Sequence, residues 1–327
     1  LIKFQMKIKV KKKKLLISLK NYKFYMILLI STLIINCAYS LENRILFKID
    51  NEIITSIDIK NETFYLSNLN KNIKQLSKKQ IFEISKESLI REKVKKKNII
   101  KFFGKIDVEE NISDNFVKNF YERLNIKSKK ELENYLEKNG LDISYIEEKI
   151  NIEVMWNRLV YYKYKSQVKI NNKKIRDKVL ESKSKNNKSY FLQEIVFEVQ
   201  KNENPINKYN KIVQDIKNLG FEETALIYSV SNSQRESGNI GWVNETTINQ
   251  NILNKIKNLS VGDITPIIRI PGGFLILRIK DFRTEKKDIN VEKEVSKIIK
   301  EKTNEQLNQF SLIFYSRLKK DVIIDEL

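Results

Sequence analysis

The sequence predicts an α+β protein: a mainly helical N-terminal domain that is completed by a C-terminal helix and strand, with a smaller α+β module inserted. Apolar residues recur at helical spacing through most of the first half and again near the end of the chain. Six of the eight glycines and all three prolines lie between Pro205 and Gly273. Because Gly tolerates positive φ and Pro fixes φ, this cluster marks a compact, turn-rich module.

A β-hairpin and a helix are expected at the start of the helical domain. The apolar runs Ile45–Ile49 and Ile53–Thr55 flank a short polar turn, which is typical of a hairpin. Ser56 is then expected to begin a helix.

From Ser77 to Lys169 the spacing of apolar residues predicts helices that share one core. Gly140 stands where a C-terminal cap is needed. The polar residues 171–188 are expected to hold a short helix at Ile175–Leu180 and then a linker. Four serines are expected to begin helices: Ser77 with Gln80, Ser113, Ser128 with Glu131, and Ser144 with Glu147.

The inserted module is expected to combine strands with short helices. Its segments are a strand at Tyr190–Val199, helices at Asn207–Leu219 and Phe221–Tyr228, and strands at Ile264–Ile270 and Phe274–Ile279.

The last segment is predicted to return to the helical domain. Asn290–Leu318 has the pattern of a helix with an apolar stripe that it cannot bury alone. The strand Val322–Ile324 is expected beside Ile45–Ile49. The predicted boundaries are residues 1–40 for a signal peptide, 41–188 for the helical domain, 189–284 for the module and 285–327 for the C-terminal helix and strand.

The N-terminus has the pattern of a secretory signal peptide. Lysines precede an apolar run of 15 residues, Phe24–Ala38, and Ala38 and Ser40 supply small residues for cleavage. As a helix this run is about 22 Å long at about 1.5 Å per residue, which is shorter than a hydrocarbon core of about 30 Å. We therefore expect cleavage near Ser40, with Met6 or Met26 as the natural start.

Missing residue types exclude several kinds of chemistry. Cys37 is the one cysteine, and cleavage near Ser40 removes it, which excludes disulfides and thiolate catalysis from the mature chain. Lipidation at Cys37 is a minor alternative, because Asn36 is not the small residue that such a site needs. The chain has no histidine, the usual general base and the commonest metal ligand. We expect neither a metal nor a cofactor.

The strong positive charge does not indicate nucleic-acid binding. The formal charge is +21, of which the nine lysines of residues 1–40 supply +9 and the rest of the chain +12. Only ten of the 62 basic residues are Arg, whose planar fork reads base edges best. The lysines are spread through the predicted helices, so no nucleic-acid partner is expected.

The order and spacing of several segments resemble two known families. In the module these are Phe221–Ser229, Gly238–Trp242, Leu259–Asp263, Pro266–Ile267 and Gly273–Leu277. On these segments, Tyr190–Arg283 resembles a parvulin-type, PpiC-like peptidyl-prolyl isomerase domain. The helical domain is similar to that of SurA-type periplasmic chaperones through Ile49–Thr55, Asp58–Ile59, Leu89–Lys93 and Trp156–Val160. SurA-type chains typically carry two parvulin modules, and this chain has room for one.

The parvulin resemblance implies the site residues. Active parvulins have one His in the first strand and a second in the last, and Glu194 and Leu275 stand at these positions. The family's Cys or Asp corresponds to Ser231. A substitute hydrogen bond between Glu194 and Ser231 is one interpretation, but we favour ordinary polar residues there and plain core for Leu275. The apolar peptide pocket corresponds to Ile240, Ile248, Ile252 and Phe274.

Three functions are compatible with these observations. The first is a periplasmic chaperone that binds unfolded outer-membrane proteins in a groove between helical domain and module, with a catalytically degenerate isomerase domain. Catalysis must favour the twisted amide against a barrier of about 18–20 kcal/mol, and the family's paired-His network cannot form. The alternative is an active peptidyl-prolyl isomerase that uses the apolar pocket alone. The third is a membrane-tethered or lipidated helical protein whose module is a docking surface.

The expected partners follow from the first function. They are unfolded client chains, particularly segments with proline or aromatic residues, which extended-chain sites bind by apolar contact and backbone hydrogen bonds. The net charge of +12 outside residues 1–40 favours transient contact with a membrane surface or with acidic clients, within the limits of salt screening.

Overall fold

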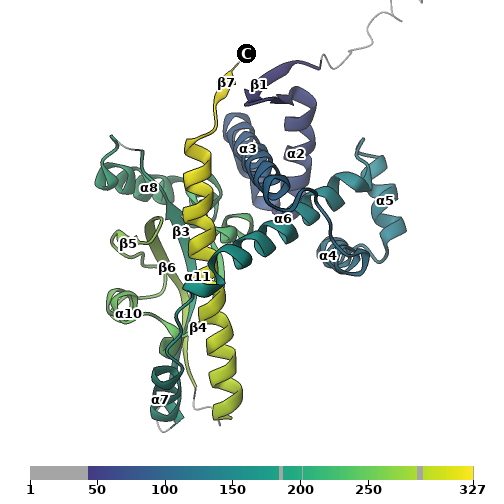
Figure 1. Ribbon diagram of the computed structural model, residues 1–327. Coiled ribbons are helices and arrows are strands. Elements are labelled where there is room, and N and C mark those ends of the chain that lie inside the picture. Colours follow the sequence, from purple (N-terminus) through teal and green to yellow (C-terminus); the bar gives the residue numbers. More distant parts are fainter. Residues whose placement is uncertain (1–42, 184–186, 201, 286–289, 327) are drawn as a thin grey trace, which may run out of the picture. The chain divides into compact units, whose positions relative to one another are not determined.

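The structure is a computed structural model that describes residues 43–183, 187–200, 202–285 and 290–326 (Figure 1). The predicted signal peptide, residues 1–40, lies outside the described residues. The described chain from Ile45 onward contains a three-stranded sheet in the order β2-β1-β7 and a four-stranded sheet in the order β4-β3-β6-β5. The predicted α+β class is confirmed.

The N-terminal hairpin and the helix after it form as predicted. β1 (Ile45–Ile49) pairs antiparallel with β2 (Glu52–Thr55), and α2 (Ser56–Leu69) follows directly. The Thr55 hydroxyl accepts the N–H of Asp58, and the Asp58 carboxylate accepts the N–H of Thr55 at 2.8 Å. This reciprocal capping box begins the helix at Ser56.

The helical domain continues through six further elements. The predicted capping box of Ser77 and Gln80 is confirmed. Ser128 caps its helix, but the Glu131 carboxylate accepts the N–H of Lys127 instead of closing the box. Gly140, with φ +74°, ends the same helix as predicted. The elements are η1 (Lys71–Gln75), α3 (Lys78–Phe103), α4 (Glu110–Arg123), α5 (Lys129–Glu137), α6 (Ile143–Tyr164) and η2 (Lys165–Gln167).

Two predicted helix starts are wrong. α4 begins at Glu110, three residues before Ser113. α6 begins at Ile143, because the Asp142 carboxylate accepts the N–H of Ser144 at 2.8 Å and so occupies the capping position. The polar segment after α6 is also more ordered than a linker, since α7 spans Asn172–Lys183.

The module is built around the four-stranded antiparallel sheet. β3 and β6 pair from Asn187–Glu285 to Phe197–Phe274. The predicted strand at Ile264–Ile270 is shorter, because Pro266 cannot donate to a strand ladder. The elements are β3 (Asn187–Phe197), α8 (Pro205–Leu219), α9 (Phe221–Tyr228), η3 (Asn232–Glu236), β4 (Asn239–Asn244), η4 (Glu245–Thr247), α10 (Gln250–Ile256), β5 (Ile268–Ile270) and β6 (Gly273–Glu285).

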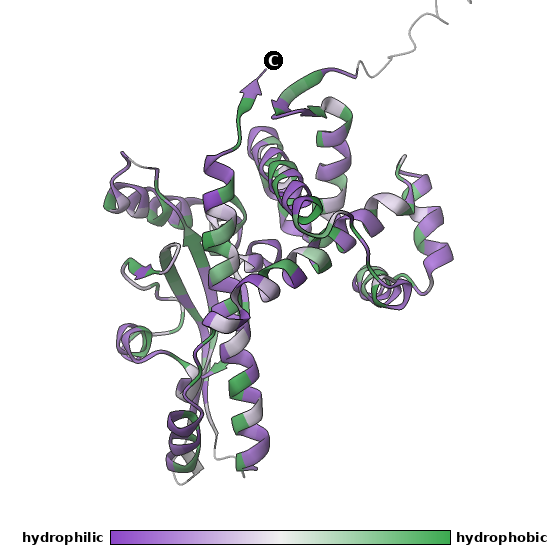
Figure 2. Cartoon of the chain, viewed as in Figure 1, coloured by the Kyte–Doolittle hydropathy of each residue, from purple (hydrophilic) through white to green (hydrophobic). Residues whose placement is uncertain are grey.

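The two faces of this sheet pack on different helices. Side chains alternate along a strand, so Leu275 and Leu277 of β6 face one side, and Phe274 and Ile276 face the other. The first side packs with Ile248 and residues of α10, and the second with residues of α8 and α9. Figure 2 shows hydrophobic residues along β3 and β6 and mostly hydrophilic ones on α7.

The C-terminal segment returns to the helical domain as predicted. α11 (Val291–Lys320) leads into β7 (Ile324–Glu326), which pairs antiparallel with β1, Ile324 lying opposite Ile49. The strand begins two residues later than the predicted Val322. The module is therefore an insertion between α7 and α11 (Figure 1).

An aromatic contact anchors α11 on α6. The rings of Trp156 and Phe314 stack with centroids 5.2 Å apart and planes 7° apart. The Trp156 indole N–H donates to the Ser311 hydroxyl at 2.8 Å. Trp156 is only 1% exposed and Phe314 8%, so the stack is buried, whereas the hydrogen bond is partly buried. Nearer its N-terminus, α11 packs Val295 and Ile298 against Val179 of α7.

A shared carboxylate links the helical domain to the module. Glu153 of α6 accepts from Lys95 at 2.7 Å and from Arg235 of η3 at 3.2 Å. Asn70 also donates to the Arg235 carbonyl at 3.1 Å and to the Ser237 hydroxyl at 2.7 Å. The helical domain therefore holds the loop of the module that follows α9.

Two cations around one anion set the ionisation of this cluster. Burial would raise the pKa of Glu153, but attraction by Lys95 and Arg235 outweighs it and lowers the pKa to about 2. Burial lowers the pKa of Lys95 to about 8, and the neighbouring Arg235 acts in the same direction against the attraction of Glu153.

We predict that Glu153→Gln destabilises the protein. The change leaves Lys95, which is 6% exposed at its side chain, without its anion. Breaking a buried pair costs about 3–5 kcal/mol, and because Glu153 is itself 32% exposed we expect a loss of roughly 2 kcal/mol in the free energy of unfolding.

Denaturant unfolding at several pH values measures this loss. The depressed pKa of Glu153 means that its contribution is complete above about pH 4.5 and is lost as the pH falls toward 2, so variant and wild type should converge in acid. Glu148→Gln is the control. Glu148 lies on α6, as Glu153 does, but it is an exposed partner of Lys96, so its loss should cost under about 0.5 kcal/mol. A loss at Glu153 no larger than the control's contradicts the role of the cluster.

Candidate peptide-binding site

A cavity of about 570 Å³ lies over one face of the four-stranded sheet. Its floor is formed by alternate side chains of β3 and β6, which share that face. Residues of β4, η4 and α10 form one wall, and α11 forms another. The sheet and α10 side is apolar: Leu192, Val196, Ile248, Ile252, Leu275 and Leu277.

The structure brings six of the seven predicted site residues together at this cavity. They are Glu194, Ser231, Ile240, Ile248, Ile252 and Leu275. Ile248 and Leu275 are buried in the adjoining core, whereas Ile240 is 42% exposed at the rim. The cavity thus combines an apolar floor with an accessible apolar edge.

The prediction that Phe274 lines the peptide pocket is wrong. Phe274 points to the opposite face of the sheet, where its ring stacks on Phe197 with centroids 5.6 Å apart. Adjacent residues of a strand face opposite sides, so Phe274 and Leu275 cannot both line the cavity. Phe274 is part of the core beneath α8 and α9.

A chain of hydroxyl groups leads to the Glu194 carboxylate. Ser233 donates to Glu194 at 2.8 Å, Ser231 lies 2.7 Å from Ser233, and Ser229 lies 3.0 Å from Ser231. The N–H of Val196 donates to the Ser229 hydroxyl at 3.1 Å. An ionised carboxylate only accepts, so the Ser233 proton goes to Glu194, Ser233 then accepts from Ser231, and Ser231 accepts from Ser229. Glu194 and Ser231 are therefore connected, but through Ser233.

Backbone geometry fixes this connection. The Glu194 N–H donates to the Gly238 carbonyl at 2.7 Å. Gly238 has φ +76°, and a Cβ there would lie 2.3 Å from the Glu194 carbonyl oxygen. Only glycine permits so close an approach of the loop to β3.

The same surroundings shift the ionisation of Glu194. Burial raises the pKa of its carboxyl, the hydroxyls of Ser233 and Ser231 oppose that shift, and the charge of Glu305 on α11 adds to it. Leu275, opposite Val196 in the strand register, presents only carbon to the cavity. No imidazole stands at either position that the parvulin resemblance assigns to histidine.

The contribution of α11 was missed by sequence reasoning. The helix lines the cavity with polar residues, among them Glu301 and Glu305, and with Leu312. Its apolar stripe is interrupted at Lys300–Gln306, where no apolar residue occurs. That interruption was the available signal, because a helical stretch without an apolar face is not packed on a core. The alternating serines at 229, 231 and 233 were the signal for the hydroxyl chain.

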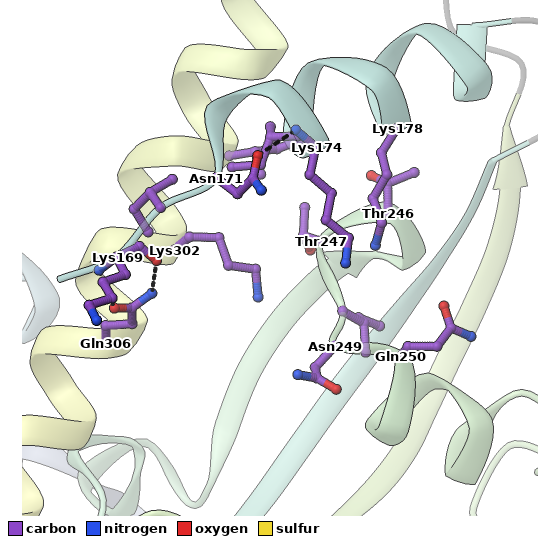
Figure 3. A pocket seen from close by; sticks show the side chains of 14 residues that line it. Lys169, Asn171, Lys174, Lys178, Thr246, Thr247, Asn249, Gln250, Lys302 and Gln306 are labelled. Atoms are coloured by element: carbon purple, nitrogen blue, oxygen red, sulfur yellow. Dashed lines mark hydrogen bonds between the residues drawn. The ribbon is translucent and has the colours of Figure 1, made fainter.

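Two further cavities adjoin the first. One, of about 500 Å³, lies between α7, α11 and the loop before α10 (Figure 3). The other, of about 380 Å³, lies between Pro271 and α11. Asn249 and Lys302 line all three cavities, which therefore adjoin one another along α11 and are together called the groove. Among the described residues, no group of three or more Asp and Glu side chains is arranged to hold a metal ion.

Comparisons with known proteins agree with this architecture. The family model "Rotamase: PPIC-type PPIASE domain" matches residues 192–281. A Chaperone SurA of Nitrosococcus oceani is 26% identical over 161 residues, covering 46% of this chain and 38% of that protein. A Chaperone SurA of Chromobacterium violaceum is 24% identical over 213 residues, covering 63% and 49%.

One match among the solved structures is partial. It is described as one of two SurA-like chaperones of Campylobacter jejuni, and it is 15% identical, with 87% of this chain and 99% of that chain covered and a TM-score of 0.33. The matched segments span about half the length, or less, of the curated relatives. None of the helices within the described ranges is both long and apolar enough to cross a bilayer.

The fold and the family match define the inserted module as a PpiC-type, or parvulin, domain, a class of peptidyl-prolyl isomerases. Over the matched segments, the chain is similar to SurA chaperones.

We predict a distinctive pH dependence for Glu194→Gln. A carboxyl whose pKa is raised on folding binds its proton more tightly in the folded state, so its contribution to stability is complete at low pH and is lost as the pH rises through the folded pKa. The amide keeps an acceptor for Ser233 but does not ionise. The stability of the variant relative to wild type should therefore increase between pH 4 and pH 7.

Thermal unfolding at both pH values measures this difference. Glu137→Gln, at the exposed end of α5, controls for the loss of one negative charge. If the stability of Glu194→Gln relative to wild type instead falls as the pH rises, the folded protein stabilises the ionised carboxylate and the prediction is wrong.

Proposed function

We propose that the protein is a periplasmic chaperone that binds unfolded outer-membrane proteins, and that its PpiC-type domain holds peptide segments without efficient isomerisation. One observation carries this proposal. The cavity keeps its apolar floor and wall, while Glu194 and Leu275 stand where the resemblance places two histidines.

The groove suits extended chains. Three adjoining cavities follow α11, and the rim includes the exposed side chains of Ile240 and Trp242, at 42% and 39%. An unfolded client can place apolar residues against this surface and leave its other residues in solvent. Each fully buried apolar side chain contributes about 1.5–3 kcal/mol before the ordering cost.

The chemistry of isomerisation is poorly served by the same cavity. The barrier to rotation is about 18–20 kcal/mol, and each tenfold acceleration requires about 1.4 kcal/mol of preferential binding of the twisted amide. Leu275 offers no hydrogen bond for that purpose. The Glu194 carboxylate already accepts from Ser233 and cannot donate while it is ionised.

An active isomerase is the second candidate, and the hydroxyl chain favours it. The serines 229, 231 and 233 form an oriented polar network at the site where the family uses imidazole. If the rotation needs only desolvation of the amide plus one polar group, this network supplies that group.

Client binding tests the chaperone function. The purified protein should suppress aggregation of a urea-denatured outer-membrane polypeptide, and Ile252→Asp should weaken binding at least about tenfold, because a charge enters the apolar wall. Ile240→Asp, at the exposed rim, should act in the same direction with less effect on folding. Ile206→Asp, at an exposed position outside all three cavities, is the matched control. Equal binding by all four proteins refutes the site.

A protease-coupled proline-isomerisation assay separates the two candidates. We expect a rate within about threefold of the uncatalysed exchange, which takes tens to hundreds of seconds. A large acceleration that Ile252→Asp abolishes and Ile206→Asp preserves would overturn the proposed loss of catalysis.

Export is a further part of the proposal. The mature protein recovered from the periplasm should begin at or near Leu41, as measured by intact mass and N-terminal sequencing. An N-terminus with the leader intact, or a lipid on Cys37, would instead support the membrane-tethered alternative.

A further inference from the structure

The second cavity of the groove is lined by lysines and by no acidic residue. It is formed by α7, the loop through Thr247 and Asn249, and α11 (Figure 3). Its charged lining residues are Lys169, Lys174, Lys178 and Lys302. The cavity of the peptide site differs, since Glu194 and three glutamates of α11 line it.

Three of these lysines converge. In Figure 3 the side chains of Lys174 and Lys178 run from α7 toward Thr247 and Asn249, and Lys302 extends from α11 toward the same space. Lys169 points away from that space.

Within the described part of the chain, the two α7 lysines have no acidic partner. Among the described residues, no carboxylate lies within ion-pair distance of Lys174 or Lys178, whereas Lys302 pairs with Glu305 at 2.6 Å. Like charges four residues apart on one helix repel each other. An anion placed between them would relieve that repulsion and gain from each ammonium group.

The position of the lysines determines which anion fits. Thr247, Ile248 and Asn249 line both this cavity and the apolar peptide cavity. The two cavities therefore adjoin at Ile248, and an extended chain advances about 3.3 Å per residue. A residue about two or three positions from one seated against Ile248 therefore reaches the lysines.

We propose that Lys174, Lys178 and Lys302 form an acidic-residue subsite. It binds the side-chain carboxylate of Asp or Glu in a polypeptide whose apolar or proline residue occupies the neighbouring cavity. This inference rests on the proposed peptide-binding function and adds a charge pattern to it: an apolar residue followed or preceded, about two or three positions away, by an acid.

Binding of two labelled peptides tests the subsite. Both contain the same proline and aromatic core, and one carries Glu three residues from the proline where the other carries Gln. At low ionic strength we expect the Glu peptide to bind about fivefold more tightly, since partly exposed ion pairs contribute modestly and several act together. The preference should shrink at 0.3 M salt.

Variants assign the preference to the cavity. Lys174→Gln with Lys178→Gln should reduce the ratio of the two affinities to about one and leave the affinity for the Gln peptide unchanged. Lys173→Gln with Lys300→Gln is the matched control, because it removes one exposed lysine from α7 and one from α11 outside all three cavities. This control variant should retain the wild-type ratio of the affinities for the Glu and Gln peptides.

The possible results separate this inference from the function on which it rests. Binding of both peptides with equal affinity overturns the subsite and keeps the peptide site. A preference that survives in the α7 double variant, or disappears in the control, also overturns the subsite. Binding of neither peptide overturns the peptide-binding function itself. A double variant that loses affinity only for anionic lipid vesicles shows that the lysines serve a membrane surface instead.

Discussion

The stack of Phe314 on Trp156 is the contact on which the arrangement of the site depends. With the Ser311 hydrogen bond, it attaches α11 to α6 at a buried position. The same helix then supplies one wall of the peptide cavity. The module is inserted between α7 and α11. The helix α11 is therefore both the attachment that follows the module and a wall of its cavity. Aromatic pairs of this kind contribute about 0.5–1.5 kcal/mol beyond the area that they bury, and Glu153 adds a second attachment through Arg235.

The proposed binding function does not require the imidazoles that the parvulin resemblance assigns to the site. The apolar floor comes from the alternation of β3 and β6, which the whole sheet enforces, so it does not depend on any catalytic residue. The polar groups at the site satisfy one another, from the Val196 N–H to the Glu194 carboxylate. A closed chain of this type stabilises the loop, and it leaves little donor capacity for a twisted amide.

Local signals predicted most of the fold. The errors arose where two local signals compete or where strand alternation was not applied, and long-range contacts were not predicted at all. The helix α8 ends before Gly220 as expected, but it begins at Pro205, two residues before the predicted Asn207, because Pro is favoured in the first turn of a helix. Asp142 and Ser144 both suit a helix cap, and only the folded chain chooses between them. The cavity residues followed from the family pattern. The prediction for Phe274 was inconsistent with strand alternation, because its neighbour Leu275 was already assigned to the site and adjacent residues face opposite sides. The pairing of Arg235 with Glu153, 82 residues apart, carries no sequence signal.

One measurement tests the central claim most directly. Exchange NMR on a proline peptide mixed with the protein reports, in one sample, contact with the cavity and the rate of cis–trans exchange. We expect shifts of the methyl signals of Ile240, Ile248 and Ile252 on peptide addition, with cis–trans exchange as slow as in free peptide. Rapid exchange between cis and trans signals of the bound peptide, or methyl shifts confined to the opposite face of the sheet around Ile212, would contradict it.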